Sequence, residues 1–174
     1  MKLNFEKIYK KFKGEVPCPE NCFCCCFNET GALDFLPEEH KYLCKKLPQA
    51  KKYIKHKKIN GINYYYIKFP CPFLKNNKCS IREFRPFDCR TFPLDFCMFN
   101  NKIFTIVSSK RCPVIKIIKK QDIQKISKLI INVISKVDKK WVEAARMIGS
   151  CGNCKYKNTC NICNQKSCIF DKGW

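Results

Sequence analysis

Cysteine is the residue through which this chain is most able to do chemistry, because sixteen of its 174 residues are cysteines. They form two groups, one between Cys18 and Cys112 and one between Cys151 and Cys168. Thiolates in loops suit a metal, since its ligands must converge from several directions at about 2.3 Å. This density is typical either of a secreted disulfide scaffold or of a set of metal ligands.

The start of the sequence argues against secretion. The segment MKLNFEKIYKKFKGEVPC scatters lysines among its apolar residues and is therefore not expected to be a signal peptide. The longest apolar runs, such as 129–131, are far below the roughly 18 residues of a membrane span. Thiols in a reducing cytoplasm stay reduced unless they bind metal or work in redox chemistry. We expect a cytoplasmic protein whose cysteines are metal ligands.

Short sequence motifs surround the first cysteine group. They are Cys18-x3-Cys22-x2-Cys25-Cys26, then L-P-E-E, then C-P-F-L from Cys71, C-S-I-x-x-x-R-P from Cys79, and C-R-x-F-P from Cys89. In this order and spacing the chain resembles the YkgJ-type family, the CxxCxxCC zinc- or iron-chelating domain, which includes flagellin lysine N-methylase. The resemblance covers roughly residues 15–115. It departs from the family pattern in the first gap, x3 in place of x2, and in the additional Cys24.

The resemblance implies a metal site built by the first group. Six cysteines match the family's positions, namely Cys22, Cys25, Cys26, Cys71, Cys79 and Cys89. The departures leave open whether Cys18 or Cys24 is a ligand; Cys18 is included in the predicted set together with Cys112, with Cys97 behind it. Six or more thiolates exceed the four of a structural zinc, and adjacent Cys25 and Cys26 reach different metal atoms more naturally. One polynuclear site or two sites are favoured, with iron-sulfur preferred to zinc.

Arg85 and Arg90 flank Cys89 and fall on the R-P and C-R motifs. Their guanidinium groups are candidates for binding the cofactor, by donating hydrogen bonds to cluster sulfurs, or for binding an anionic substrate. An ordinary salt bridge to Asp88 or Glu83 is the equally weighted alternative.

The C-terminal group forms a separate predicted site. It reads C151-G-N-C154-K-Y-K-N-T-C160-N-I-C163, with Cys168 behind. Two CxxC pairs five residues apart can surround one metal with little other structure. The pattern is similar to the auxiliary iron-sulfur segments of SPASM-type radical enzymes, except that the last gap is x2. The predicted ligands are Cys151, Cys154, Cys160 and Cys163; a zinc knuckle is the alternative.

The formal charge of +21 is the second feature that bears on function. Bound thiolates would lower it, but a strongly basic protein would remain. Such a field steers an acidic protein partner or protein substrate, which we favour among partners, or nucleic acid. The alternative is a lysine-rich proteome, in which lysine is simply the usual solvated residue. The sequence therefore predicts an iron-sulfur protein of electron transfer or of protein modification, such as lysine N-methylation. The alternatives are a zinc-stapled basic binding module, in which tyrosines 64–66 stack on bases, and metal storage or delivery.

Other chemistries lack their residues. Cys18-x3-Cys22-x2-Cys25 also spells the radical S-adenosylmethionine signature, but neither its preceding strand nor the length of its barrel is present. No G-x-G turn indicates a Rossmann-type methyltransferase. The only histidines, His40 and His56, are expected at the surface, and no Ser-His-Asp set or paired carboxylates indicate hydrolysis.

The elements that must position the cysteines are of mixed type. Helices are predicted over 3–12, 34–47 and 121–148, the last with a buried apolar stripe that includes Trp141 and with Gly149 as its C-cap. Hairpins are predicted at Asn60-Gly61 and around residues 100–101. We expect an α+β domain over 1–148 and a small metal-binding tail over 149–174. Cys44, on a predicted helix, is expected to be merely buried.

Overall fold

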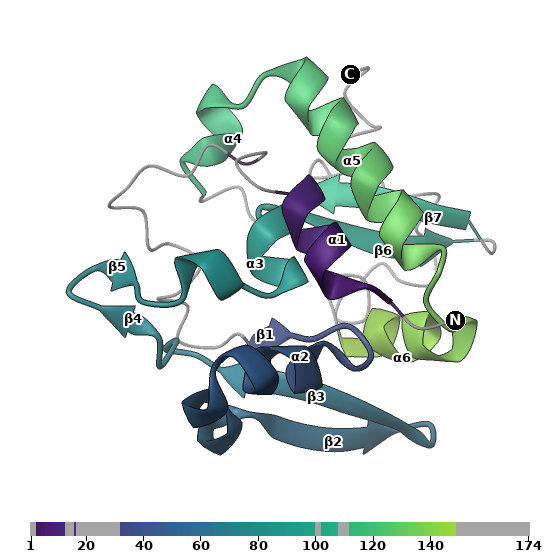
Figure 1. The fold of residues 1–174 in the computed structure, drawn as a ribbon. Coiled ribbons are helices and arrows are strands. Elements are labelled where there is room, and N and C mark those ends of the chain that lie inside the picture. Colours follow the sequence, from purple (N-terminus) through teal and green to yellow (C-terminus); the bar gives the residue numbers. More distant parts are fainter. Residues whose placement is uncertain (1–2, 13–15, 17–31, 100–101, 108–111, 149–174) are drawn as a thin grey trace.

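The computed structural model describes residues 3–12, 16, 32–99, 102–107 and 112–148. Within these residues helices and short antiparallel strands are mixed, which confirms the α+β class (Figure 1). The cysteine segment 18–26, the C-cap at Gly149 and the tail predicted as a second unit lie outside the described residues. No helix in the described part is both long and apolar enough to cross a membrane.

The three-stranded sheet has the order β1 (Ala32–Asp34), β3 (Ile62–Lys68), β2 (Lys55–Ile59), and its neighbouring strands are antiparallel. The predicted hairpin is confirmed, because Asn60 and Gly61 join β2 to β3 with φ values of 47° and 81°. Both positions of such a two-residue turn require positive φ. Helix α2 (Glu39–Lys46) and the 3-10 helix η1 (Pro48–Tyr53) pack on one face, and α6 (Lys139–Ile148) packs on the other.

The helix predicted from residue 34 begins five residues later than expected. Residues 32–34 form a strand instead, and the chain turns through Glu38, whose φ is 65°, before α2 starts at Glu39. The reason is tertiary. Leu33 and Phe35 are each only 1% exposed, and an extended backbone places them in the core, with the Phe35 N–H donating to the Tyr65 carbonyl at 3.1 Å.

Two further hairpins complete the strands of the described part. The predicted one is confirmed as β6 (Leu94–Phe99) and β7 (Lys102–Val107), and α5 (Lys120–Ile134) packs against it. The other, β4 (Leu74–Lys75) and β5 (Lys78–Cys79), was not predicted. Its signal is K-N-N-K, since Asn76 and Asn77 adopt φ values of 48° and 58°, which asparagine tolerates better than most residues.

The single helix predicted over 121–148 is wrong, because the chain forms α5 and α6 with a break at 135–138. Ser135 donates its hydroxyl to the Asn132 carbonyl at 3.1 Å, and the Val137 N–H bonds the Ile134 carbonyl in a tight turn. Asp138 then accepts a hydrogen bond from the Lys140 N–H at 2.7 Å and caps α6. The apolar stripe is continuous across the break, and Trp141 is buried at 5% exposure as predicted.

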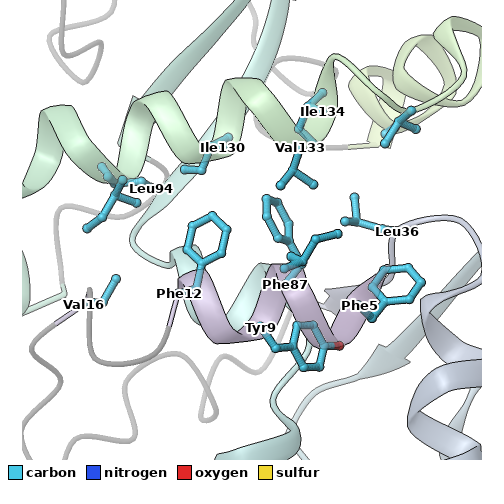
Figure 2. Packing of buried hydrophobic residues seen from close by; sticks show 14 of the residues in the cluster. Phe5, Tyr9, Phe12, Val16, Leu36, Phe87, Leu94, Ile130, Val133 and Ile134 are labelled. Carbon is cyan, nitrogen blue, oxygen red and sulfur yellow. The ribbon is translucent and has the colours of Figure 1, made fainter. Parts of the chain in front are cut away.

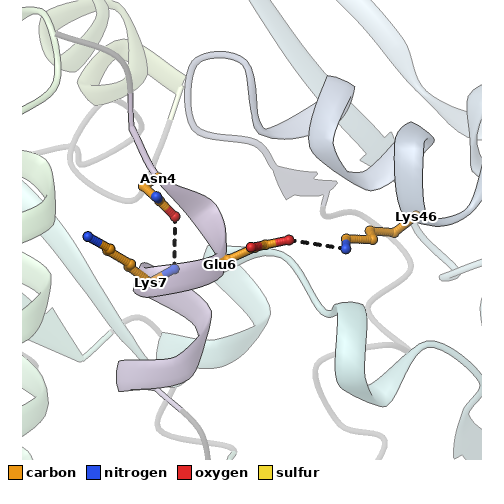
Figure 3. Close-up of polar contacts among 4 residues, drawn as sticks. All are labelled: Asn4, Glu6, Lys7 and Lys46. Atoms are coloured by element: carbon orange, nitrogen blue, oxygen red, sulfur yellow. Dashed lines mark hydrogen bonds and ion pairs between the residues drawn. The ribbon is translucent and has the colours of Figure 1, made fainter.

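The N-terminal helix is confirmed as α1 (Phe5–Lys11), and it lies between α5 and the sheet layer (Figure 1). Asn4 caps it by accepting from the Lys7 N–H at 3.0 Å, and Glu6 pairs with Lys46 of α2 at 3.1 Å (Figure 3). Its apolar face enters what we name the main core, where it meets α5 and Phe87 (Figure 2). Labelled members of this core are Phe5, Tyr9, Phe12, Leu36, Leu94, Ile130, Val133 and Ile134.

A second core lies between the sheet face that α2 covers and the segment 71–81. Its buried members are Leu33, Phe35, Leu43, Ala50, Ile67, Cys71, Phe73 and Ile81. The 3-10 helix η2 (Arg82–Phe84) and helix α3 (Phe87–Thr91) follow this segment, and α4 (Val114–Ile117) precedes α5. Of the predicted ligands that the structure describes, Cys112 belongs to the main core, and Cys71, Cys79 and Cys89 belong to the second core or pack against it.

Candidate metal centre

Six of the sixteen cysteines lie within the described residues: Cys44, Cys71, Cys79, Cys89, Cys97 and Cys112. The other ten lie outside them, including the predicted ligands Cys18, Cys22, Cys25, Cys26, Cys151, Cys154, Cys160 and Cys163, and also Cys24 and Cys168. Among the described residues no group of three or more Cys, His, Asp or Glu is arranged to hold a metal ion. The described part therefore supplies some of the predicted ligands and not a complete site.

Three predicted ligands border the second core. Cys71 is a buried member at 8% exposure, while Cys79 and Cys89 are partly buried and pack against it. They come from the start of the β4–β5 segment, from β5 and from α3. The β4–β5 hairpin brings the first two toward each other, since Cys79 pairs with Leu74 and the Leu74 N–H donates to the Cys71 carbonyl at 3.1 Å.

The remaining described cysteines lie elsewhere. Cys112 is 2% exposed and belongs to the main core, and Cys97 is 5% exposed on β6. Cys44 lies on α2 as predicted but is partly buried, not buried, and burial raises the pKa of its thiol. Cys112 thus belongs to a different core from Cys71, Cys79 and Cys89.

Glu39 joins the two segments that carry the motifs. Its side chain is 0% exposed and accepts three hydrogen bonds, from the Tyr9 hydroxyl at 2.6 Å, the Phe87 N–H at 2.7 Å and the Leu36 N–H at 2.9 Å. Burial raises the pKa of Glu39 from 4.5 to about 7, against the lowering effect of these donors and of Arg90. The second glutamate of L-P-E-E therefore fixes the start of α3, which carries Cys89.

Arg90 is engaged in holding the same segment together. Its Nε donates to the Arg85 carbonyl at 2.6 Å, and its Nη2 donates to the Glu83 carbonyl. The guanidinium lies over the Tyr9 ring, 4.1 Å from the ring centre, and interacts with Glu39 and Cys89. These contacts replace the expected side-chain salt bridge to Asp88 or Glu83, and they give Arg90 a structural role beside a predicted ligand.

Arg85 differs from Arg90 in its hydrogen bonding. Its side chain is partly buried, and its Nε is buried without a hydrogen-bond partner. Its charge lowers the pKa of Arg90, whose largest shift comes from burial, so the two guanidinium groups lie near each other. Of the two arginines, Arg85 is the one whose buried Nε donor is unsatisfied, which makes it the better candidate for contacting a cofactor or an anion.

Three carboxyl groups meet where β1, α3 and β6 come together. The Asp34 N–H donates to Asp88 Oδ2 at 3.1 Å, and the Tyr64 hydroxyl hydrogen-bonds the Asp34 side chain. Burial raises the pKa values of Asp34 and Asp95 to about 6, and burial together with these neighbours raises that of Asp88 well above its ordinary value. Motif spacing could not indicate this cluster, because its members come from three separate segments.

Motif spacing assigned no role to Glu39, Tyr9 or the three aspartates. Of these residues only Glu39 belongs to a quoted motif, as the last residue of L-P-E-E. No family model matches the chain, and neither the curated proteins nor the solved structures provide a significant match.

Proposed function

We propose that this chain is a cysteine-ligated metalloprotein that binds iron-sulfur clusters and serves electron transfer or a cluster-dependent protein modification. The supporting observation is that Cys71 is a buried member of the second core and that Cys79 and Cys89 pack against the same core. Those three come from separate elements, and the contacts of Glu39 and Arg90 hold the α3 segment in place. Cysteines clustered along a hydrophobic border are suited to cluster binding, where burial limits access of water to the sulfurs.

The thiol count of the chain extends this proposal beyond the described residues. Three thiolates are fewer than the four that a cubane cluster takes. A fourth ligand for this site would come from the segment 18–26, because Cys112 belongs to the main core. Two sites, one in the first group and one in the tail, use the predicted ligands most completely. When bound, such a cluster supplies one-electron redox chemistry; the chain's own residues position the sulfurs and balance their charge.

The proposal is tested on protein purified without oxygen. Stoichiometric iron and acid-labile sulfide, with broad absorption near 400 nm, are the expected result. Colourless protein that contains zinc and lacks sulfide would overturn the iron-sulfur assignment in favour of the zinc-stapled alternative.

Matched cysteine variants locate the site. Cys71→Ser, Cys79→Ser and Cys89→Ser should each lower the iron bound per chain, whereas Cys44→Ser should leave it unchanged, because Cys44 belongs to none of the cysteine motifs. Equal iron content in all four variants would exclude the border of the second core as the site. Electron paramagnetic resonance of the reduced protein then distinguishes one cluster from two.

A further inference from the structure

The chain's only two histidines both lie against the ring of Tyr65, although they are separated by sixteen positions in the sequence. His40 of α2 stacks on Tyr65 with ring centres 3.6 Å apart and ring planes 14° apart. His56 of β2 is the cross-strand partner of Tyr65, at 6.0 Å and 36°. His56 is exposed, and the other two rings are partly exposed. We name these three residues the ring array.

The segment that carries the ring array is rich in lysines. Residues 39–68 contain nine lysines, all exposed, and their one acidic residue is the buried Glu39. Within the described residues, ion pairs are formed by Lys41 with Glu38 and by Lys46 with Glu6, and by none of the other seven lysines of this range. Of the elements in this range, α2, η1 and β2 lie together at one end of the molecule (Figure 1). We name this the basic face.

The basic face is unsuited to taking up another strand. β2 is an edge strand, and Lys55, His56, Lys57 and Lys58 are exposed on both of its sides. Lysine along an edge opposes pairing with a further strand. A partner peptide is therefore not expected to pair with this sheet edge through its backbone. A partner of this face would instead be contacted by the side chains.

From the ring array and the basic face together, we propose that this end of the molecule binds single-stranded nucleic acid. Lysine side chains would contact the phosphates, and the ring array would present aromatic faces or edges to unstacked bases. An acidic protein would account for the lysines but leaves the three associated rings without a role. Proteins that bind single-stranded nucleic acid combine cationic side chains, which contact the phosphates, with aromatic rings on which the bases stack. Tyr65 packs against the second core, as Cys79 and Cys89 do, so iron is measured in every variant, and a loss of oligonucleotide binding at unchanged iron content separates this proposal from the proposed metal centre.

The test measures binding of a fluorescein-labelled thymidine or uridine oligonucleotide of about 15 nucleotides by fluorescence anisotropy, using the whole chain purified without oxygen. Tyr65→Ala should weaken binding by about fivefold or more, as loss of one stacked base does, while Tyr65→Phe should retain it within about twofold. A DNA duplex should bind more weakly and respond equally to both variants, because its bases are not available. Comparing the thymidine with the uridine oligonucleotide shows whether the face prefers single-stranded DNA or RNA.

A charge-matched pair separates the basic face from general basicity. Lys55→Gln with Lys58→Gln should lower affinity and reduce the salt dependence of log K by about 1.4, the value expected for two phosphate contacts on a single strand. Lys120→Gln with Lys128→Gln, on α5 at the opposite end of the molecule, removes the same charge and should leave affinity nearly unchanged (Figure 1).

Three results would overturn the proposal: unchanged binding by Tyr65→Ala, equal losses from the two lysine pairs, or a poly-glutamate chain that binds as tightly and responds identically to the variants. If Tyr65→Ala fails to fold, as judged by circular dichroism, His56→Ala replaces it. His56 is exposed, so this variant is expected to fold. It should weaken oligonucleotide binding by about threefold or more, and unchanged binding by folded His56→Ala would count against the proposal in the same way.

Discussion

Glu39 accepts a hydrogen bond of 2.7 Å from the backbone N–H of Phe87, the first residue of α3. Through this bond a fully buried carboxyl group connects the start of α2 with the helix that carries Cys89. A buried acidic group is retained only where donors satisfy it, and here three donors from separate parts of the chain do so. The position of the α3 segment, and with it that of Cys89, depends on this side chain together with Arg90.

Replacing Glu39 should therefore destabilise the whole fold. Glu39→Ala leaves the Tyr9 hydroxyl and two backbone N–H groups buried without an acceptor, which we expect to cost about 3 kcal/mol or more of the free energy of unfolding. Glu39→Gln keeps one carbonyl oxygen and should cost less. Urea unfolding measures both, and Glu38→Gln, one position earlier and exposed, is the control that should leave the midpoint unchanged. Equal midpoints for Glu39→Ala and the control would contradict this role.

The buried carboxyl groups should also make stability depend on pH. Burial raises the pKa of Glu39 from 4.5 to about 7, and those of Asp34 and Asp95 from 3.8 to about 6. Between these limits the folded protein binds more protons than the unfolded chain, so the free energy of unfolding falls as pH rises. The contribution of these groups is complete below about pH 4 and is lost as pH rises through about 6 to 7.

This dependence is measured as the urea midpoint from about pH 5 to about pH 8. The midpoint should decrease over the interval, and Glu39→Gln should flatten the decrease near neutral pH, because its amide does not titrate. A wild-type midpoint that rises over the same interval would show that the three carboxyl groups are ionised in the folded protein and paired with cations.

Sequence reasoning succeeded where structure is decided by neighbouring residues. The Asn60-Gly61 pair specifies its own turn, and a two-residue turn fixes the register outward from it, so that His56 must lie opposite Tyr65. The apolar spacing of α1 and the buried stripe through Trp141 are equally local signals. These features follow from backbone preference and period alone.

It failed where a distant segment decides the outcome. From local signals alone, Asp34 is predicted to start a helix. Residues 32–34 form a strand because they pair with β3, which also buries Leu33. The apolar stripe continues through 135–138, so its period gave no sign of the break that Asp138 creates by capping α6. The stacking of His40 on Tyr65 depends on how α2 docks on the sheet, which no short motif encodes.

Replacement by lysine should destabilise the protein at Arg90 but not at Arg85. Arg90 is 6% exposed, donates to two backbone carbonyls and stacks on Tyr9. Lysine cannot reproduce these contacts, because it lacks the planar guanidinium group with its several N–H donors. Arg90→Lys should cost about 2 kcal/mol of the free energy of unfolding, the loss expected from charged hydrogen bonds to the backbone.

Arg85→Lys is the matched control, since the Arg85 Nε has no hydrogen-bond partner to lose. Its unfolding midpoint should stay close to that of the wild type. If Arg85 balances cluster charge, Arg85→Gln should lower the iron retained after gel filtration without a comparable loss of stability. Equal destabilisation by both lysine variants would show that the contacts of Arg90 contribute nothing specific.

Gly61 offers a test of the hairpin that carries the basic face. Its φ is 81°, and a Cβ atom added there would meet no atom within 4 Å, so that Gly61→Ala is opposed by backbone conformation and not by a clash. We expect a cost of about 1 kcal/mol in thermal or urea unfolding. Because the turn fixes the register that places His56 beside Tyr65, a folded Gly61→Ala protein that keeps this register should bind the oligonucleotide as the wild type does. A larger loss of binding than of stability would mean that the turn residues themselves belong to the binding surface.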